Sequence, residues 1–230
     1  VLRNVKVLGW RSNGDGVHVF DSWTVSDLFL RTQDDSLYLS CGDKCSATFD
    51  RITTWNDANG VAFLFSPGGG SAEAGVVLRD SDAIYSRTSW YWWGPNTVFV
   101  NRGDAPNHAM SGVRVENVRV EDPRPAFNPF RLELLTPAAG AAFRDITFVN
   151  ITVQNFSTIR HTLDGRTPLP YGIPNSIFAA APCSISNVAF DNVTIAGRPM
   201  RDLVRDPSIF NLSVGLVNVT VDGTPIVRAS

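Results

Sequence analysis

A repeated pattern of apolar residues constrains the fold of this 230-residue chain more than any other feature of its sequence. Each copy has two apolar residues separated by one position, then two other residues, then two more apolar residues separated by one position. An asparagine stands directly before the third apolar residue. The clearest copies are VRVENVRV (113–120), ITFVNITV (146–153), VAFDNVTI (188–195) and VGLVNVTV (214–221). WTVSDLFL (23–30) fits with Asp27 in the asparagine position, and ATFDRITT (47–54) fits loosely.

Alternation with a period of two predicts that each half of the pattern is a short β-strand with one buried face. Because Asn and Asp tolerate left-handed backbone conformations, the residue between the halves marks a bend. Bent strand pairs repeated at intervals of 24 to 42 residues predict the coils of a parallel β-helix, separated by loops of different length. A β-sandwich is the competing architecture, but outside SNGDG (12–16) few of the two-residue hairpin signals that it needs occur. We therefore predict an all-β, parallel β-helix fold.

Length and composition fit one domain. No long run rich in Pro, Gly or Ser divides the chain, so we predict a single catalytic domain over residues 1–230. The chain begins inside the pattern, and we expect further N-terminal sequence to precede it. A net charge of −2 gives no reason to expect nucleic acid or a membrane as partner, and no apolar run is long enough to span a bilayer. We expect a monomer.

The cysteines and histidines show no metal-binding pattern. Cys41 and Cys45 are candidates for a small disulfide loop in an oxidising compartment, with unrelated thiols as the alternative. The three histidines are scattered along the chain, so we predict neither a metal site nor a cofactor. Five Asn-X-Ser/Thr sequons occur, and three coincide with the asparagine of the repeat, which favours a structural role over glycosylation.

Three aspartates are the candidate catalytic residues. Asp15 lies in SNGDGVHVF, and Asp34 and Asp35 follow 19 and 20 residues later in RTQDDSLYLS. This interval is about one coil, so the three carboxylates are expected on adjacent strands, roughly 4.8 Å apart on one face of the sheet. Asn-Gly-Asp-Gly is also good turn chemistry, and clustered carboxylates can bind Ca²⁺, so both alternatives stay open.

Carboxyl groups this close cannot all ionise easily, and at least one is expected to have a raised pKa. A protonated acid beside an ionised carboxylate is the arrangement that hydrolysis of a glycosidic bond requires. Small and polar neighbours leave room for a substrate and offer hydrogen bonds. These neighbours are Asn13, Gly14, Gly16, Thr32, Gln33 and Ser36.

The stretch NVKVLGWRSNGDGV…FLRTQDDSLYL resembles the catalytic region of glycoside hydrolase family 49, the dextranases and isopullulanases, over roughly residues 5–65. The resemblance implies a right-handed parallel β-helix, shared with the polygalacturonases of family 28, and a secreted inverting hydrolase. It implies Asp34 as general acid, with Asp15 and Asp35 activating water. The polygalacturonase signature continues with Gly-His-Gly and Arg-x-Lys, which this sequence lacks, and this counts against a pectin-cleaving enzyme.

Aromatic and polar residues near the acids are candidates for sugar binding, because flat rings with polar edges suit sugar faces and hydroxyl groups. Packing within the fold is the alternative for each of them. The candidate substrate-binding residues are Trp10, Arg11, Asn13, Gln33, Trp55, Asn56, Trp90, Tyr91 and Trp92. We expect a polysaccharide substrate, specifically a neutral α-glucan. An acidic polysaccharide and a non-catalytic, glycan-binding or adhesive β-helix are the alternatives.

Overall fold

The structure is a computed structural model that describes residues 1–11, 13–40, 46–57, 60–65, 73–86, 99–103, 111–121, 130–134, 142–154, 184–203 and 215–226. The described chain is nearly all β-strand, with one short helix, α1 (Met200–Leu203). The prediction of an all-β chain is therefore confirmed.

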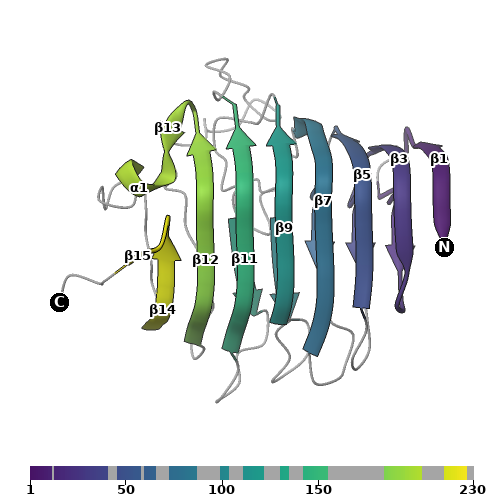
Figure 1. Cartoon of the computed structure of the whole chain (residues 1–230). Helices are drawn as coiled ribbons and strands as arrows, with labels where there is room; N and C mark the ends of the chain where they lie inside the picture. The colour runs from purple at the N-terminus through teal and green to yellow at the C-terminus, as the bar shows by residue number, and fades with distance from the viewer. Residues whose placement is uncertain are drawn as a thin grey trace, which may run out of the picture.

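The long strands form one large sheet in which neighbouring strands follow chain order and run parallel (Figure 1). They are β1 (Leu2–Leu8), β3 (Thr24–Thr32), β5 (Ser46–Asn56), β7 (Glu73–Ser86), β9 (Ser111–Val120), β11 (Ala142–Val153), β12 (Ser184–Ile195) and β14 (Gly215–Val221). Two short antiparallel strands, β13 (Arg198–Pro199) and β15 (Thr224–Pro225), pair with β12 and β14.

A second parallel sheet is built from the short strands that separate the first long ones in the chain. They are β2 (Val17–Val19), β4 (Leu37–Leu39), β6 (Phe63–Phe65), β8 (Phe99–Gly103) and β10 (Phe130–Leu134). From β1 to β11 the chain visits the large and the small sheet alternately. We call one long strand and the short strand after it one circuit of the chain.

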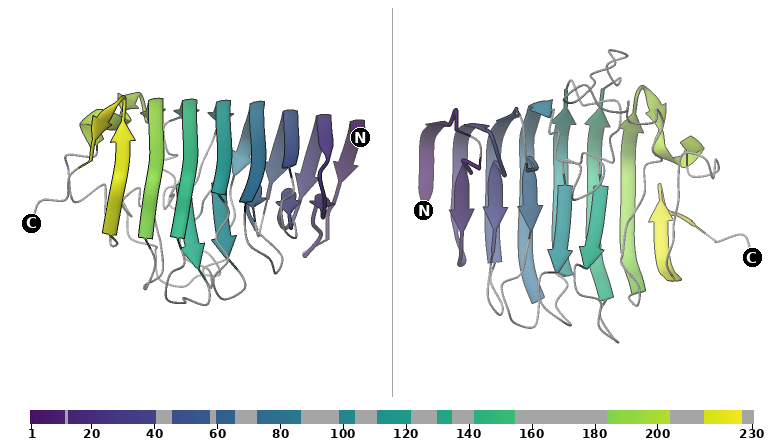
Figure 2. Two further views of the ribbon diagram at one scale, coloured as in Figure 1. Left: turned by 60° about the horizontal axis from the view of Figure 1, so that its bottom comes forward. Right: turned by 180° about the vertical axis from the view of Figure 1, so that it is seen from behind.

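The core lies between the two sheets (Figure 2). Alternate residues of the long strands are buried, as in β3 and β5. The first and last residues of the short strands Leu37–Leu39 and Phe63–Phe65 are also buried and belong to the same core. Phe49 of the large sheet stacks on Phe65 of the small sheet, with ring centroids 6.5 Å apart. Burying each such aromatic or aliphatic side chain contributes about 1.5–3 kcal/mol, so the apolar alternation selects which face of each strand turns inward.

The predicted bends occur inside the long strands, at one column of residues that the strand register aligns. Members of this bend column have φ angles of 50° to 57°, in the left-handed region. Neighbouring asparagines also bond to one another: Asn150 Nδ2 donates to Asn117 Oδ1, and Asn192 Nδ2 donates to Asn150 Oδ1, each at 2.9 Å. The column comprises Asn4, Asp27, Arg51, Asp80, Asn117, Asn150 and Asn192.

The segment 214–221 does not repeat the frame of 188–195, and this part of the sequence interpretation is wrong. Val188 pairs with Val219, which aligns Asn218 with Asn187. Asn218 Nδ2 donates to Asn187 Oδ1 at 2.9 Å, and Asn187 Nδ2 donates to Asp145 Oδ1 at 2.9 Å, forming a second bend column. The reason is that β12 carries two asparagines five positions apart, each followed by alternating apolar residues, so the pattern alone fits either register.

Candidate active site

The three aspartates lie just before the first residues of β2 and β4, at one edge of the small sheet. Asp15 precedes β2 by two residues and Asp35 precedes β4 by two residues. Backbone hydrogen bonds extend the parallel pairing back to them: Gly16 N donates to Asp35 O at 2.9 Å, and Val17 N donates to Ser36 O at 3.0 Å. Asp15 and Asp35 are therefore neighbours in adjacent circuits, with Asp34 one position earlier.

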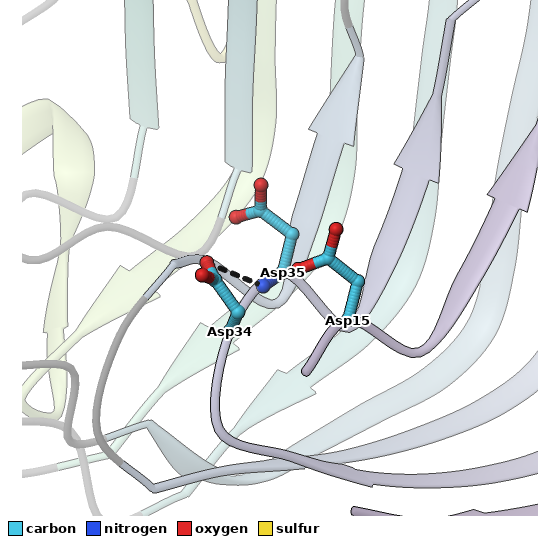
Figure 3. Close-up of side chains that lie close together, drawn as sticks. All are labelled: Asp15, Asp34 and Asp35. Carbon is cyan, nitrogen blue, oxygen red and sulfur yellow. Dashed lines mark hydrogen bonds between the residues drawn. The ribbon is translucent and has the colours of Figure 1, made fainter. Parts of the chain in front are cut away.

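The structure brings the three carboxyl groups together, as the 19-residue interval indicated (Figure 3). One carboxylate oxygen from each residue lies within 4.8 Å of the other two. Asp15 is exposed, and Asp34 and Asp35 are partly buried. We call these three residues the acid trio.

Each acid is oriented by a contact with a nitrogen atom of the protein. Asp34 Oδ1 accepts a hydrogen bond from the backbone N of Asp35 at 2.9 Å, and Asp35 Oδ1 accepts one from the backbone N of Val61 at 2.8 Å. Asp15 Oδ2 lies 2.6 Å from Nε2 of His18. The sequence interpretation did not select Val61 or His18, since nothing in their local sequence indicates these contacts.

His18 is itself held between aromatic rings. The ring of Tyr38, its neighbour across β2 and β4, meets it edge to face at a centroid distance of 4.6 Å, and Phe20 lies at 5.7 Å. This packing limits the imidazole to a small range of orientations, so that Nε2 stays directed at Asp15.

Gly60 leaves the space that the acids occupy. It stands one circuit after Asp34 and has a φ of +66°, and a Cβ placed on it would lie 2.5 Å from Oδ1 of both Asp34 and Asp35 and 2.2 Å from the backbone N of Asp35. A side chain at this position would therefore overlap the acid trio. In the sequence, Asn59-Gly60 indicates only a turn.

Buried polar side chains fix the loop of residues 33–36, which we call the acid loop. Thr32 Oγ1 donates to the carbonyl of Asp34 at 2.8 Å and lies 2.7 Å from Ser36 Oγ. Asn56 Nδ2 donates to the same carbonyl at 2.5 Å. Asn56 was expected to contact substrate, but its side chain is fully buried and supports the acid loop from beneath.

A row of flat side chains runs across the ends of β1, β3, β5 and β7. The guanidinium carbon of Arg31 lies 5.1 Å from the ring centroid of Trp10 and 5.4 Å from that of Trp55. The Trp55 ring in turn lies 5.1 Å from that of Tyr85. We call Trp10, Arg31, Trp55 and Tyr85 the aromatic row.

Asp57 joins the aromatic row to the acid loop. Its Oδ2 accepts hydrogen bonds from Arg31 Nε and Nη2 at 3.1 and 3.0 Å and from Gln33 Nε2 at 2.9 Å. Its Oδ1 accepts one from Trp55 Nε1 at 2.6 Å. Of the other expected sugar-binding residues, Arg11 and Asn13 are exposed beside the acid trio in the chain.

Several expected residues lie outside the described part of the chain. These are Trp90, Tyr91 and Trp92 of the aromatic cluster, and Cys41 and Cys45 of the disulfide candidate. Their roles stay predictions.

Within the described residues, the acid trio is the group whose oxygens are close enough together to hold a metal ion. Three of its carboxylate oxygens already lie within hydrogen-bond distance of nitrogen atoms of Val61, His18 and Asp35.

Comparison of the chain with known protein families, curated proteins and solved structures found no significant match. Among the described residues, no helix is long and apolar enough to cross a membrane. Function is therefore inferred from the geometry of the site.

Proposed function

We propose that the chain is a right-handed parallel β-helix and a secreted glycoside hydrolase that cleaves a polysaccharide. The solenoid is supported by two parallel sheets in chain order and by the alternation of the chain between them. The resemblance of residues 5–65 to family 49 supports the handedness and the activity.

The observation that carries the proposal is the approach of the three carboxyl groups to within 4.8 Å. In the proposed reaction Asp34 donates its proton to the glycosidic oxygen as the bond from that oxygen to the anomeric carbon breaks. A carboxylate of Asp15 or Asp35 takes a proton from water, and the water oxygen forms the new bond to the anomeric carbon.

Two observations bear differently on the stereochemistry. The resemblance to family 49 implies inversion, whereas the oxygen separation in the trio is shorter than the roughly 6.5–9.5 Å of most inverting pairs and closer to the roughly 5–5.5 Å of retaining pairs. We propose inversion, because a third carboxylate can position water beside the acid. NMR of the first-formed product anomer tests this, and retention of configuration refutes it.

The proposed substrate is a neutral α-glucan of the dextran or pullulan kind. The test is release of reducing ends from dextran, pullulan and polygalacturonate. We expect hydrolysis of a neutral polymer, and a loss of at least about 100-fold in Asp34→Asn, since a general acid contributes roughly 10²- to 10⁴-fold.

Glu116→Gln is the matched control, because Glu116 is a surface carboxylate on β9 that pairs with Arg114 at 2.7 Å. It should retain full activity.

The polymer test also separates the alternatives. Cleavage of polygalacturonate rather than a neutral polymer would favour the acidic-polysaccharide alternative. Binding without cleavage of any polymer would favour a non-catalytic glycan-binding protein.

A further inference from the structure

Arg31 lies at the edge of the acid loop, but its charge is already neutralised. Two of its nitrogens, Nε and Nη2, donate to Oδ2 of Asp57 at 3.1 and 3.0 Å. Its guanidinium plane is held between Trp10 and Trp55, at 5.1 and 5.4 Å. Ion pairing and cation–π contact both favour this position, so the side chain would lose several interactions by turning towards a ligand.

The side chain of Asp57 is 19% exposed, and Arg31 is not its only partner among the described residues. It also accepts hydrogen bonds from Gln33 and Trp55, at 2.9 and 2.6 Å. Because Gln33 directly precedes Asp34, one partly buried carboxylate fixes both the arginine and the start of the acid loop. Asp57 is thus committed to protein groups.

The Trp10 end of the aromatic row offers an exposed ring to a ligand. Trp55 has Arg31 on one side and Tyr85 on the other, so a sugar could not stack on it without displacing one of them. Trp10 is 64% exposed and is contacted by Arg31. Trp10 therefore presents an exposed aromatic surface at this end of the row.

The charge around this surface opposes acidic ligands. The acid trio and Asp57 place four carboxyl groups in the segments that follow β1, β3 and β5, the same strand ends that carry Trp10, Arg31 and Trp55, and the guanidinium of Arg31 there is already paired with Asp57. A uronate carboxylate bound here would be repelled by these groups and would find Arg31 occupied.

We propose that Trp10 is a stacking platform for a sugar ring of an uncharged glycan, and that Asp57 sets this preference by withholding Arg31 from substrate carboxylates. The inference rests on the proposed function for the position of the cleaved bond, but it concerns binding. Trp55, expected from the sequence to bind sugar, instead supports Arg31.

The test measures binding in the Asp34→Asn background, where turnover is suppressed, with dextran and polygalacturonate as probes in affinity electrophoresis. We expect retardation by dextran and none by polygalacturonate. Trp10→Ala should weaken dextran binding about three- to tenfold, the range for one aromatic contact. The control is Trp23→Ala. Trp23 is also exposed, at 38%, but it lies at the start of β3, whereas Arg31 lies near the end of that strand. It should leave binding unchanged.

Asp57→Asn tests the second half of the proposal by releasing Arg31. We expect polygalacturonate binding to emerge, to weaken with added salt, and to vanish when Arg31→Gln is added. Circular dichroism shows whether the Asp57→Asn variant folds. The polymer preference of the Asp34→Asn protein, without any further substitution, tests the proposal independently of that variant. If this protein binds polygalacturonate as tightly as dextran or more tightly, the proposal is overturned.

The outcomes separate this inference from the proposed function. Dextran binding that depends on Trp10, without hydrolysis of any polymer by the wild-type protein, overturns the hydrolase and supports the platform. Hydrolysis of dextran with binding unaffected by Trp10→Ala overturns the platform alone.

Discussion

At the scale of single residues, Gly60 shows how an absent side chain defines a site. A Cβ there would overlap both Asp34 and Asp35, and the φ of +66° disfavours any other residue. Gly60→Ala should therefore lower hydrolysis by about 100-fold, the effect of misplacing a catalytic group by about 1 Å. Initial rates and thermal unfolding of the purified variant check this.

Gly197→Ala is the matched control for that substitution. Gly197 has a similar φ of +73°, but a Cβ on it meets no described atom within 4 Å. Both variants should be destabilised by about 1–3 kcal/mol from backbone strain, and only Gly60→Ala should lose activity. Equal activity in the two variants would show that the acid trio does not need the space above Gly60.

In the proposed reaction His18 is a positioning residue that acts through Asp15. Its Nε2 lies 2.6 Å from Asp15 Oδ2, and removing it frees that carboxylate to rotate. We expect His18→Ala to lower kcat by about ten- to 100-fold with little change in KM. His18→Gln retains a donor and should recover part of the loss. A change in KM alone would place His18 in substrate binding instead.

At the scale of the strands, side chains of the bend column join several neighbouring strands by hydrogen bonds. Asn150 donates to Asn117 and accepts from Asn192, at a φ of 54°. Asn150→Ala should lower the free energy of unfolding by about 2–4 kcal/mol, from two lost hydrogen bonds and a strained alanine. Asn150→Gly removes only the hydrogen bonds, so urea unfolding of both variants separates the two contributions.

The same column contains a charged pair whose contribution depends on pH. Hydrogen bonds from the Arg51 guanidinium and then from Ser26 lower the pKa of Asp27 below its usual 3.8. A carboxyl whose pKa is lower in the folded state stabilises the fold above its unfolded pKa, and this stabilisation is lost as pH falls through the folded pKa. Asp27→Asn should thus be less stable than wild type at neutral pH and equally stable in strong acid.

Urea midpoints at pH 7 and near pH 2 measure this difference. Arg51→Gln should show the same pH-dependent difference from wild type, because the hydrogen bond from Arg51 is the main reason that the pKa of Asp27 is lowered. A difference that persists unchanged in acid would mean that Asp27 stabilises the bend through its backbone conformation rather than its charge.

At the scale of the whole molecule, the sequence predicts what depends on periodicity and misses what depends on side-chain contacts between circuits. The period of the strands and the 19-residue interval were sufficient to bring Asp15 and Asp34 together. The register of Asn218 was not predictable, because two asparagines in β12 give equivalent patterns. The hydrogen bonds from Arg31 to Asp57 join side chains of residues 26 positions apart, and the alternation of apolar residues carries no information about such contacts.

The two parallel sheets also predict that stability is local along the molecule, because among the described residues each long strand forms backbone hydrogen bonds only with its neighbours in the sheet. Phe190 of β12 stacks on Phe148 of β11 at 5.1 Å, and these two strands lie several positions along the sheet from β1 and β3, the strands that precede the acid trio. Phe190→Ala should cost about 3–5 kcal/mol and raise amide exchange in β11, β12 and β14 while leaving β3 and β5 protected. Phe63→Ala, in the short strand β6 next to the site, should raise amide exchange in β3 and β5 and lower hydrolysis, while β11, β12 and β14 stay protected. Uniform loss of protection in either variant would show that the two ends unfold as one cooperative unit, and damage at either end would then reach the acid trio.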